Sequence, residues 1–270
     1  MKATVGVIGA GRMGAPIIGH LVRKGFATHA CDLNPARREL VTKHGAQWAE
    51  SAAALATTCD VFLVCVGFDA EVRALLAADG ALGNVRRGSI VAILSTIHPD
   101  TVKELAAQAE SRGVHVVDST VCRGGEAADN GTLLSFVGGS ADVVQQLTPV
   151  LQAYSADVVH TGGIGTAQVA KAVNNLILWA CLVADHEGLA LAQHYGADVE
   201  ALRKALMISS WANGPLEKWG TQTMAWAEDD MVIVGEMAAK AGIALPQAGL
   251  NREVCRALKP KRYQLDKYGR

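Results

Sequence analysis

The stretch ATVGVIGAGRMG at residues 3–14 decides how the N-terminal half of this chain folds. Its first six residues are mostly small and apolar, which favours a short buried strand, and a helical pattern follows to about Gly25. A strand, a G-x-G-x-x-G turn and a helix, in this order, are typical of the dinucleotide-binding unit of a Rossmann fold. Glycine-rich turns are common, so the strand before the turn and the helix after it give the motif its weight.

Each glycine of the motif has a separate physical role. Gly9 permits the tight turn, Gly11 lets the backbone approach a pyrophosphate, and Gly14 lets the helix pack closely on the strand. The N-terminus of the helix then directs its partial positive charge at the phosphates. The cofactor-binding residues predicted for this turn are Gly9, Ala10, Gly11, Arg12, Met13 and Gly14.

Asp32 is a second signal for the same cofactor. It follows the predicted strand 28–31 and lies 23 residues after Gly9. A carboxylate there accepts hydrogen bonds from the hydroxyls of the adenosine ribose and repels a 2′-phosphate, so we expect NAD. Arg37 and Arg38 could neutralise such a phosphate, which leaves NADP possible. The alternative is that Asp32 is only a solvated carboxylate at the start of a turn.

Apolar strands and helices continue to alternate after this unit. Further strands are predicted at 61–66, 89–94, 114–117, 133–137 and 158–160. Apolar runs joined by helices predict a doubly wound parallel sheet, and we expect this Rossmann domain to span residues 1–163. Ligands of such sheets bind beyond the carboxyl ends of the strands. The segments predicted at those ends are Gly9–Gly14, Asp32, Cys65–Phe68, Ser95–Thr96 and Asp118–Gly125.

The stretch GTAQVAKAVNNLILWACLVADHEGLALAQH at residues 165–194 predicts one long helix between two domains. It contains good helix formers and no proline, and about 30 residues would span about 45 Å. Lys171 and Asn175 are four residues apart and project from one face, with Asn174 beside them. An ammonium and two amides on an otherwise apolar helix indicate a chemical role, the alternative being a surface lysine on an amphipathic helix.

The remainder, residues 195–270, predicts an all-helical C-terminal domain. Helices are expected to begin near Asp198, Pro215, Asp229 and Pro246, the second of them running through Trp226. Three tryptophans are expected to pack against the long helix, or one of them to form a wall of the substrate site; these are Trp211, Trp219 and Trp226. The polar segment 259–270 is predicted to be frayed. A bundle this small predicts packing against a second subunit in a homodimer, or a tetramer of dimers.

The composition excludes several classes of function. A formal net charge of −1 offers no general attraction for nucleic acid or an anionic membrane. The six cysteines are dispersed without a CxxC pair and the eight histidines form no ligand cluster, so we expect reduced thiols and no metal. The predicted strand begins at Ala3, and the longest apolar run is much shorter than a membrane span. We therefore expect a cytoplasmic protein that acts on a small molecule.

One loop combines glycines with an arginine. In DSTVCRGG at 118–125, the adjacent glycines expose backbone N–H groups and Arg123 could bind a carboxylate, sulfonate or phosphate through two hydrogen bonds. The alternative is that Arg123 points to solvent.

Together these motifs resemble the β-hydroxyacid dehydrogenases, the family of 3-hydroxyisobutyrate dehydrogenase, tartronate semialdehyde reductase and sulfolactaldehyde reductase. Five segments carry the resemblance, in order along almost the whole chain: VGVIGAGRMGAPI at 5–17, STIHP at 95–99, DSTVCRGGEAADNGTL at 118–133, GTAQVAKAVNNLI at 165–177 and EMAAKAGIALP at 236–246. The resemblance implies hydride exchange between a nicotinamide cofactor and the alcohol or aldehyde carbon of a short 3-hydroxy acid.

The resemblance also implies roles for individual residues. Lys171 would be the catalytic lysine and Asn175 would hold the substrate or orient that lysine. The residues that would border the cofactor are Cys65, Val66 and Thr96, and those that would bind the substrate are Cys122, Arg123, Gly124, Asn174 and Asp229.

Two regions depart from the family. The family's loop usually reads D-x-P-V-S-G-G, and a lysine usually begins a K-D-[LM] turn near the C-terminal face of the active site. Thr120, Cys122 and Arg123 replace the proline, the serine and the first glycine, and an arginine at this position resembles the sulfolactaldehyde reductase branch. Asp229 replaces the lysine, which should weaken binding of an acidic substrate. Two alternatives therefore stay open: an imine reductase-like enzyme, which usually lacks the lysine, and a cofactor-binding protein without catalysis.

Overall fold

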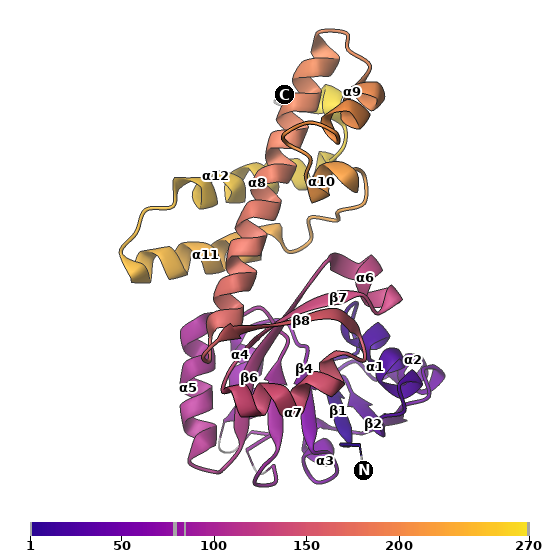
Figure 1. Cartoon of the computed structure of the whole chain (residues 1–270), viewed down its shortest axis with the longest axis vertical. Helices are drawn as coiled ribbons and strands as arrows, with labels where there is room; N and C mark the ends of the chain where they lie inside the picture. The colour runs from indigo at the N-terminus through magenta and orange to yellow at the C-terminus, as the bar shows by residue number, and fades with distance from the viewer. Residues whose placement is uncertain (1, 78–79, 84, 269–270) are drawn as a thin grey trace. The chain divides into compact units, whose positions relative to one another are not determined.

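The computed structural model describes residues 2–77, 80–83 and 85–268 (Figure 1). The chain divides into two compact units, Met1–Lys171 and Ala172–Arg270. The first unit contains the sheet and the second contains helices alone among its described residues.

The first unit is built on one eight-stranded sheet in the order β3-β2-β1-β4-β5-β6-β7-β8. Its strands are β1 (Val5–Ile8), β2 (Thr28–Cys31), β3 (Gln47–Trp48), β4 (Val61–Val64), β5 (Ile90–Ile93), β6 (His115–Cys122), β7 (Leu133–Gly138) and β8 (Ser155–Gly162). Neighbouring strands are parallel except for β6 and β7. The strand order changes direction at β1 and β4, as in a Rossmann fold. The predicted doubly wound sheet is therefore confirmed.

Strand β7 corrects one detail of that prediction, because it runs antiparallel to β6. A parallel strand needs a crossover of about a dozen residues or more to return to the other end of the sheet. Only ten residues separate Cys122 from Leu133, and the seven-residue helix α6 (Gly124–Asn130) occupies most of them. The chain therefore turns back along β6. The two-residue strand β3 was not predicted, since so short a run has no apolar period.

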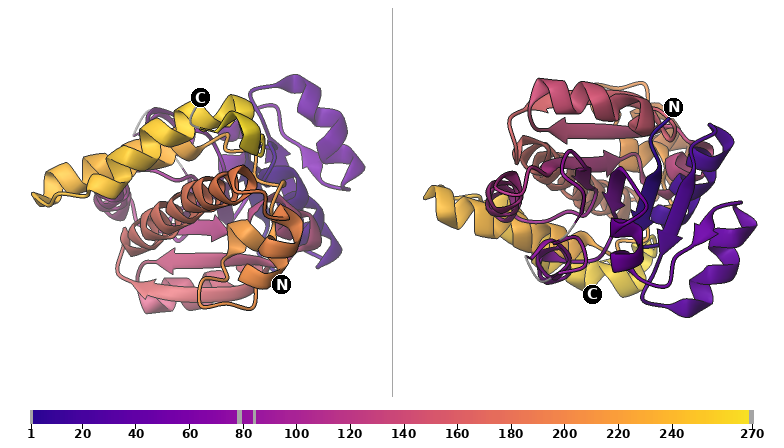
Figure 2. Two further views of the ribbon diagram at one scale, coloured as in Figure 1. Left: turned by 90° about the horizontal axis from the view of Figure 1, so that it is seen from above. Right: turned by 90° about the horizontal axis from the view of Figure 1, so that it is seen from below.

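Alternate residues of each strand supply the cores on the two faces of the sheet. In β4, Val61 and Leu63 join one core, while Phe62 and Val64 join the other. The first face is covered by α1 (Gly14–Arg23), α2 (Arg38–Lys43), α6 and α7 (Ala141–Leu151), and the second by α3 (Ala52–Ala56), α4 (Asp69–Leu76) and α5 (Pro99–Glu110). Figure 2 shows helices on both sides of the strands. The central strands are buried on both faces, which explains their continuous apolar sequences.

The predicted long helix is confirmed as α8 (Thr166–His194), an uninterrupted run of 29 residues. Among the described residues it is the one helix with the length and apolar composition of a membrane span, with a mean hydropathy of 1.4. Core helices of water-soluble proteins pass the same test. The first turns of α8 are hydrogen-bonded to residues of β6 and of the loop after β5, so this property is weak evidence for a membrane.

The second unit contains α9 (Val199–Leu206), α10 (Gly214–Glu217), α11 (Ala227–Ala241) and α12 (Pro246–Leu258) together with most of α8. Asp198 caps α9 through its side chain, as predicted. The helix predicted from Pro215 through Trp226 is wrong, because α10 ends after one turn. Gly220 and Met224 then adopt positive φ angles of 91° and 57°, which a helix cannot include.

The C-terminal segment is more ordered than predicted. Tyr263 donates its backbone N–H to His186 over 3.1 Å, and the hydroxyl of Tyr268 donates to Glu187 over 2.7 Å. Residues 269–270 of the predicted frayed tail lie outside the described residues. The two tyrosines hold this segment against α8. A tyrosine ring is stabilised by burial when its hydroxyl also has a hydrogen-bond partner.

The expectation that three tryptophans pack on α8 is correct for one of them. The ring of Trp219 lies 4.4 Å from that of His186, which belongs to α8. Trp211 and Trp226 are 81% and 58% exposed. The three positions do not share one face, since no continuous helix links them.

His186 makes the second unit sensitive to pH. Its ring is 1% exposed, its Nδ1–H donates to the carbonyl of Leu182 over 2.7 Å, and its Nε2 accepts from Tyr263. This arrangement requires a neutral imidazole. Burial lowers the pKa of His186 below its ordinary value of 6.5, with the hydrogen bond to Leu182 opposing the effect.

We predict that the second unit loses stability as the pH falls below about 6.5, because the unfolded chain then takes up a proton that the folded chain refuses. Urea denaturation at pH 7.5 and 5.5, followed by tryptophan fluorescence, measures the loss. His186→Gln retains an acceptor but cannot titrate, so it should reduce the pH dependence. His194→Gln, at an exposed position of the same helix, should retain it. Equal pH dependence in all three proteins would contradict the prediction.

Candidate active site

The glycine turn between β1 and α1 fits tightly against the neighbouring strand. Gly9 has φ +98°, and a Cβ there would lie 2.2 Å from the carbonyl oxygen of Cys65. A Cβ on Gly14 would lie 1.9 Å from the carbonyl oxygen of Gly9. The protein's own backbone therefore requires both glycines. Around Gly11, in contrast, no atom lies within 4 Å of the position that a Cβ would take, so its outer side is open.

The first turn of α1 leaves backbone donors for a ligand. Met13 stands at the N-cap position but gives no side-chain hydrogen bond. Within the described residues, no acceptor is bound by the backbone N–H groups of Arg12, Met13 and Gly14. Open N–H groups at a helix N-terminus are suited to phosphate oxygens. These features fit the pyrophosphate of a dinucleotide and place the predicted motif residues where such a cofactor could bind.

Asp32 follows β2 and braces the glycine turn. One carboxylate oxygen accepts from the backbone N–H of Ala10 over 2.7 Å, and the other accepts from Asn34 over 2.8 Å. A carboxylate oxygen has two lone pairs, so each can still accept a hydrogen bond from a ribose hydroxyl. Leu33, which the sequence reasoning did not select, is 98% exposed next to it. Its exposure beside the carboxyl end of β2 suits a flat apolar base, and no sequence pattern could have shown it.

The ends of β4 and β5 are joined by Ser95. Its hydroxyl accepts from the backbone N–H of Val66 over 3.0 Å and donates to the carbonyl of the same residue over 2.8 Å. Cys65 and Thr96, both predicted to border the cofactor, are half-buried at these two strand ends. Burial raises the pKa of Cys65 to about 11, so its thiol stays protonated and is no nucleophile. Sequence reasoning selected Thr96 and missed the structural role of its neighbour.

Asp118 fixes the start of α8. Its side chain is fully buried and accepts from the backbone N–H groups of Gly165 over 2.8 Å and Gln168 over 2.9 Å. Gln168 in turn donates to the carbonyl of Ser95 and accepts from Ile97. Desolvation raises the pKa of Asp118, and the backbone hydrogen bonds oppose that effect. These bonds join the helix to the carboxyl ends of β5 and β6.

Lys171 lies one turn beyond Gln168. Its Nζ donates to the carbonyl of Val121 over 2.9 Å and stands 3.9 Å from the sulfur of Cys122. Val121 and Cys122 belong to the part of β6 that extends past its last pair with β5, at Asp118. The structure thus brings the predicted catalytic lysine to the beginning of the predicted substrate loop, on the edge of the sheet where the glycine turn also lies.

Arg123 begins that loop in a left-handed conformation, with φ +83°. Its guanidinium forms an ion pair with Asp157 of β8 at 2.7 Å and donates to the carbonyl of Thr132 over 3.2 Å. The side chain is therefore engaged within the domain and is 44% exposed. Gly124 follows with φ +76° and open space around its Cβ position. Two consecutive positive φ angles are uncommon and typical of a functional loop.

The other predicted substrate-binding residues belong to the second unit. Asn175 follows Lys171 by one helical turn, is 3% exposed and accepts a hydrogen bond from the side chain of Asn174 over 3.0 Å. Asp229 is exposed in the first turn of α11. Its neighbour Asp230 accepts from the indole of Trp179 over 2.8 Å. Across the described ranges, histidine, cysteine and acidic side chains form no group of three or more that could hold a metal ion.

Comparison with known proteins identifies the class to which this site belongs. The profile of the NAD-binding domain of 6-phosphogluconate dehydrogenase matches residues 4–163. The profile for NAD-binding of NADP-dependent 3-hydroxyisobutyrate dehydrogenase matches residues 165–267. The chain belongs to the β-hydroxyacid dehydrogenase family and is an NAD(P)-dependent oxidoreductase.

Two curated relatives come from Pseudomonas aeruginosa. An NAD-dependent L-serine dehydrogenase is 31% identical over 214 residues, covering 79% of this chain and 72% of the relative. A 3-hydroxyisobutyrate dehydrogenase is 32% identical over 213 residues, covering 78% and 72%.

Solved structures share the fold. Mycobacterium tuberculosis 3-hydroxyisobutyrate dehydrogenase, solved with L-serine, has a TM-score of 0.88 at 24% identity, covering 97% of this chain and 95% of that one. An imine reductase variant from Myxococcus stipitatus in complex with NAD⁺ is more distant, with a TM-score of 0.70 at 20% identity and coverage of 97% and 95%.

Gly11 faces open space whereas Gly14 contacts the backbone, so we predict different effects when each is changed to alanine. Gly11→Ala should fold normally, because its Cβ meets no protein atom, but should weaken NADH binding at least about tenfold by filling the open side of the turn. Gly14→Ala should fold poorly, because its Cβ would overlap the carbonyl of Gly9. Thermal unfolding and fluorescence titration with NADH measure the two effects. A Gly11→Ala protein that binds NADH as the parent does would refute the assignment of this turn.

Proposed function

We propose that this enzyme transfers a hydride between NAD(P) and the hydroxyl-bearing carbon of a short 3-hydroxy acid, or the corresponding semialdehyde, with Lys171 as the general acid and base. The observation that carries the proposal is the position of the ammonium group, 2.9 Å from the carbonyl oxygen of Val121 at the end of β6. This is the carboxyl edge of the sheet, where ligands of doubly wound folds bind.

The chemistry that Lys171 would perform follows from its three N–H donors. One of them is used by the carbonyl of Val121, so the others can donate to the oxygen of a substrate. In the direction of reduction, the ammonium donates its proton to the aldehyde oxygen, and in oxidation the amine accepts the proton of the hydroxyl. The bound nicotinamide supplies or accepts the hydride. Asn175, one turn along α8, would orient the substrate or the lysine, with Asn174 hydrogen-bonded to it.

The substrate class is supported by the relatives and by the loop. L-Serine and 3-hydroxyisobutyrate, after which two relatives are named, both carry a hydroxymethyl group on the carbon next to a carboxylate. In this chain, Cys122, Arg123 and Gly124 would hold the acid group, which could be a carboxylate or a sulfonate. A thiol is a weaker donor than a hydroxyl, so Arg123 would supply most of the binding once it shares or exchanges its ion pair with Asp157.

Asp229 is the feature that favours another candidate. A carboxylate in place of the family's lysine disfavours an anionic substrate, and an imine reductase-like enzyme acting on a C=N bond would need no such lysine. The presence of Lys171 argues for the hydroxy acid. As for the cofactor, Asp32 would favour NAD over NADP by repelling a 2′-phosphate.

We also infer that the protein is a cytoplasmic homodimer or a tetramer of dimers. Support for an assembly comes from large apolar side chains that the second unit leaves exposed, namely Tyr195, Ile208, Trp211, Trp226, Ile243 and Leu250. A subunit contact that covers these side chains would remove their apolar area from water.

Substitution of Lys171 tests the reaction. Lys171→Met should lower kcat/KM for semialdehydes by about 10²- to 10⁴-fold, because proton transfer loses its donor, while NADH affinity stays the same. Lys204→Met, which changes a lysine that is 73% exposed in the second unit, is the control and should keep full activity. Oxidation of NADH against a panel of semialdehydes and cyclic imines gives the readout. Aldehyde reduction that survives in Lys171→Met would exclude the mechanism, and turnover of imines alone would favour the second candidate.

Substitution of an exposed tryptophan tests the assembly. Trp211→Glu should shift the protein toward the monomer, because a charge then replaces apolar area at a subunit contact. Light scattering during size-exclusion chromatography measures the mass. Ser210→Glu introduces the same charge at the adjacent exposed position and should leave the mass unchanged. A monomeric parent protein would disprove the inference.

A further inference from the structure

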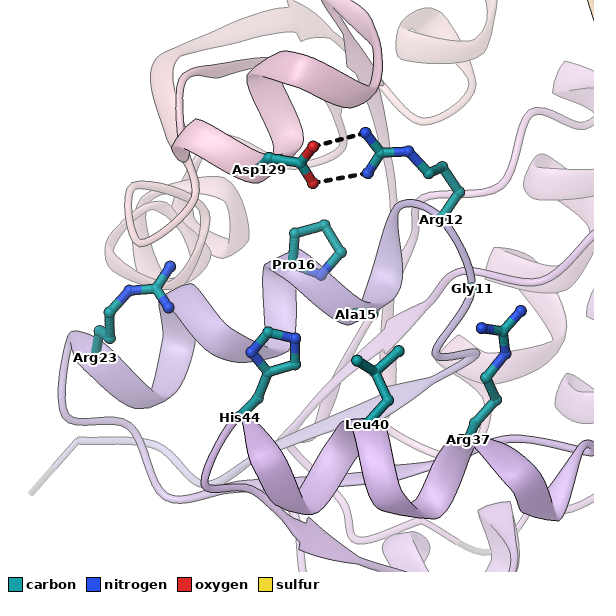
Figure 3. Close-up of a pocket in the computed structure, with 9 residues that line it drawn as sticks. All are labelled: Gly11, Arg12, Ala15, Pro16, Arg23, Arg37, Leu40, His44 and Asp129. Atoms are coloured by element: carbon teal, nitrogen blue, oxygen red, sulfur yellow. Dashed lines mark hydrogen bonds and ion pairs between the residues drawn. The ribbon is translucent and has the colours of Figure 1, made fainter. Parts of the chain in front are cut away.

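A groove with a volume of about 520 Å³ runs between α1, α2 and α6 of the first unit (Figure 3). Its lining includes Gly11, Arg12, Arg23, Arg37, His44 and Asp129. Three guanidinium groups and one imidazole thus face a single carboxylate, that of Asp129. A groove with this excess of positive charge attracts anions.

Two of the arginines stand at the end of the groove that contains Gly11 (Figure 3). Arg12 belongs to the glycine turn after β1, and Arg37 to the short helix 35–37 after β2, close to Asp32 in the sequence. Arg37 is exposed and has no ion pair within the ranges that the structure describes. These are the strand ends that would hold the adenosine half of a dinucleotide.

Arg12 has a partner that Arg37 lacks. Both of its terminal nitrogens donate to Asp129, one to each carboxylate oxygen, and both distances are 2.7 Å. The bidentate geometry directs the guanidinium toward α6, as Figure 3 shows. The guanidinium of Arg12 also lowers the pKa of Asp129, so this carboxyl is ionised at neutral pH.

The position of Asp129 is fixed by other contacts between α1 and α6. His20 of α1 contacts the carbonyls of Ala128 and Asp129 at 3.0 and 3.1 Å. A Cβ on Gly125 would lie 2.3 Å from a terminal nitrogen of Arg12, so any larger residue there would displace the arginine from its present position across the start of α6. The sequence places Asp129 more than a hundred residues from the glycine turn, and the docking of α6 on α1 brings the two together.

We propose that Asp129 is a cofactor-specificity residue: by engaging Arg12, it withholds that guanidinium from the 2′-phosphate of NADP and thereby favours NAD. A 2′-phosphate carries about 1.5 to 2 negative charges at neutral pH, so two free arginines beside it would outweigh the single carboxylate of Asp32. With Arg12 neutralised, Arg37 is left to oppose that carboxylate at this end of the groove, because Arg38 forms an ion pair with Glu50 at 3.2 Å. The proposal rests on the NAD preference proposed above but is independent of the substrate.

The expected effect is modest, since the side chains of Arg12 and Asp129 are 57% and 56% exposed. Exposed ion pairs change equilibria by a factor of only a few. Asp129→Asn should therefore bind NADPH about three- to tenfold more tightly than the parent, with NADH affinity unchanged. The same substitution should raise the affinity for 2′,5′-ADP but not the affinity for 5′-AMP, which differs from it only in lacking the 2′-phosphate. Thermal unfolding should show that Asp129→Asn is folded.

Calorimetric titration of this protein with these four nucleotides tests the proposal without any turnover. A failure of the proposed reaction therefore cannot be confused with a failure of the specificity proposal. The Arg12→Gln/Asp129→Asn double variant should lose the gain in NADPH affinity seen in Asp129→Asn alone, measured against Arg12→Gln. Asp142→Asn, at an exposed acidic position of α7, is the control and should bind all four nucleotides with the affinities of the parent. An Asp129→Asn protein with unchanged NADPH affinity, with an equal gain for NADH, or with a gain that persists without Arg12 would overturn the proposal.

Discussion

The buried carboxylate of Asp118 is the interaction on which the arrangement of the site depends. A carboxylate removed from water is costly unless hydrogen bonds replace its hydration, and here two backbone N–H groups at the start of α8 do so. Because those donors are otherwise unpaired at a helix N-terminus, one contact satisfies both partners. The helix is thereby attached to the edge of the sheet in one register.

That register determines where the chemistry can occur. Gln168 extends the attachment to the end of β5, and Thr120 donates to the carbonyl of Ala167 over 3.0 Å. Lys171 then falls one turn further, over the part of β6 that no parallel strand covers. A slip of one residue in α8 would rotate the lysine by about 100° away from this edge. The buried Asp118 therefore positions the residue that we propose carries the reaction.

A second set of contacts connects the cofactor turn to the substrate loop. Helix α6 follows directly after Arg123, and it contacts α1 through His20 and the glycine turn through Arg12. The helix whose N-terminus is suited to phosphates thus also supports the loop suited to the substrate's acid group. Interiors packed in this way transmit small displacements, because they are dense and rigid.

Local sequence by itself determined the class of fold and most of the candidate residues. The glycine spacing, the apolar strands and the uninterrupted helix at 166–194 are local patterns, and backbone sterics and side-chain periodicity act over a few residues. The tertiary structure decided what depends on distant partners: the antiparallel β7, the buried Asp118 at the start of α8, the ion pair of Arg123 with Asp157, and the exposure of Trp211. A carboxylate or an arginine carries no local mark of its partner, because that partner is selected by how strands and helices pack. The lysine could be found in the sequence, whereas the contacts that hold it in place could only be found in the fold.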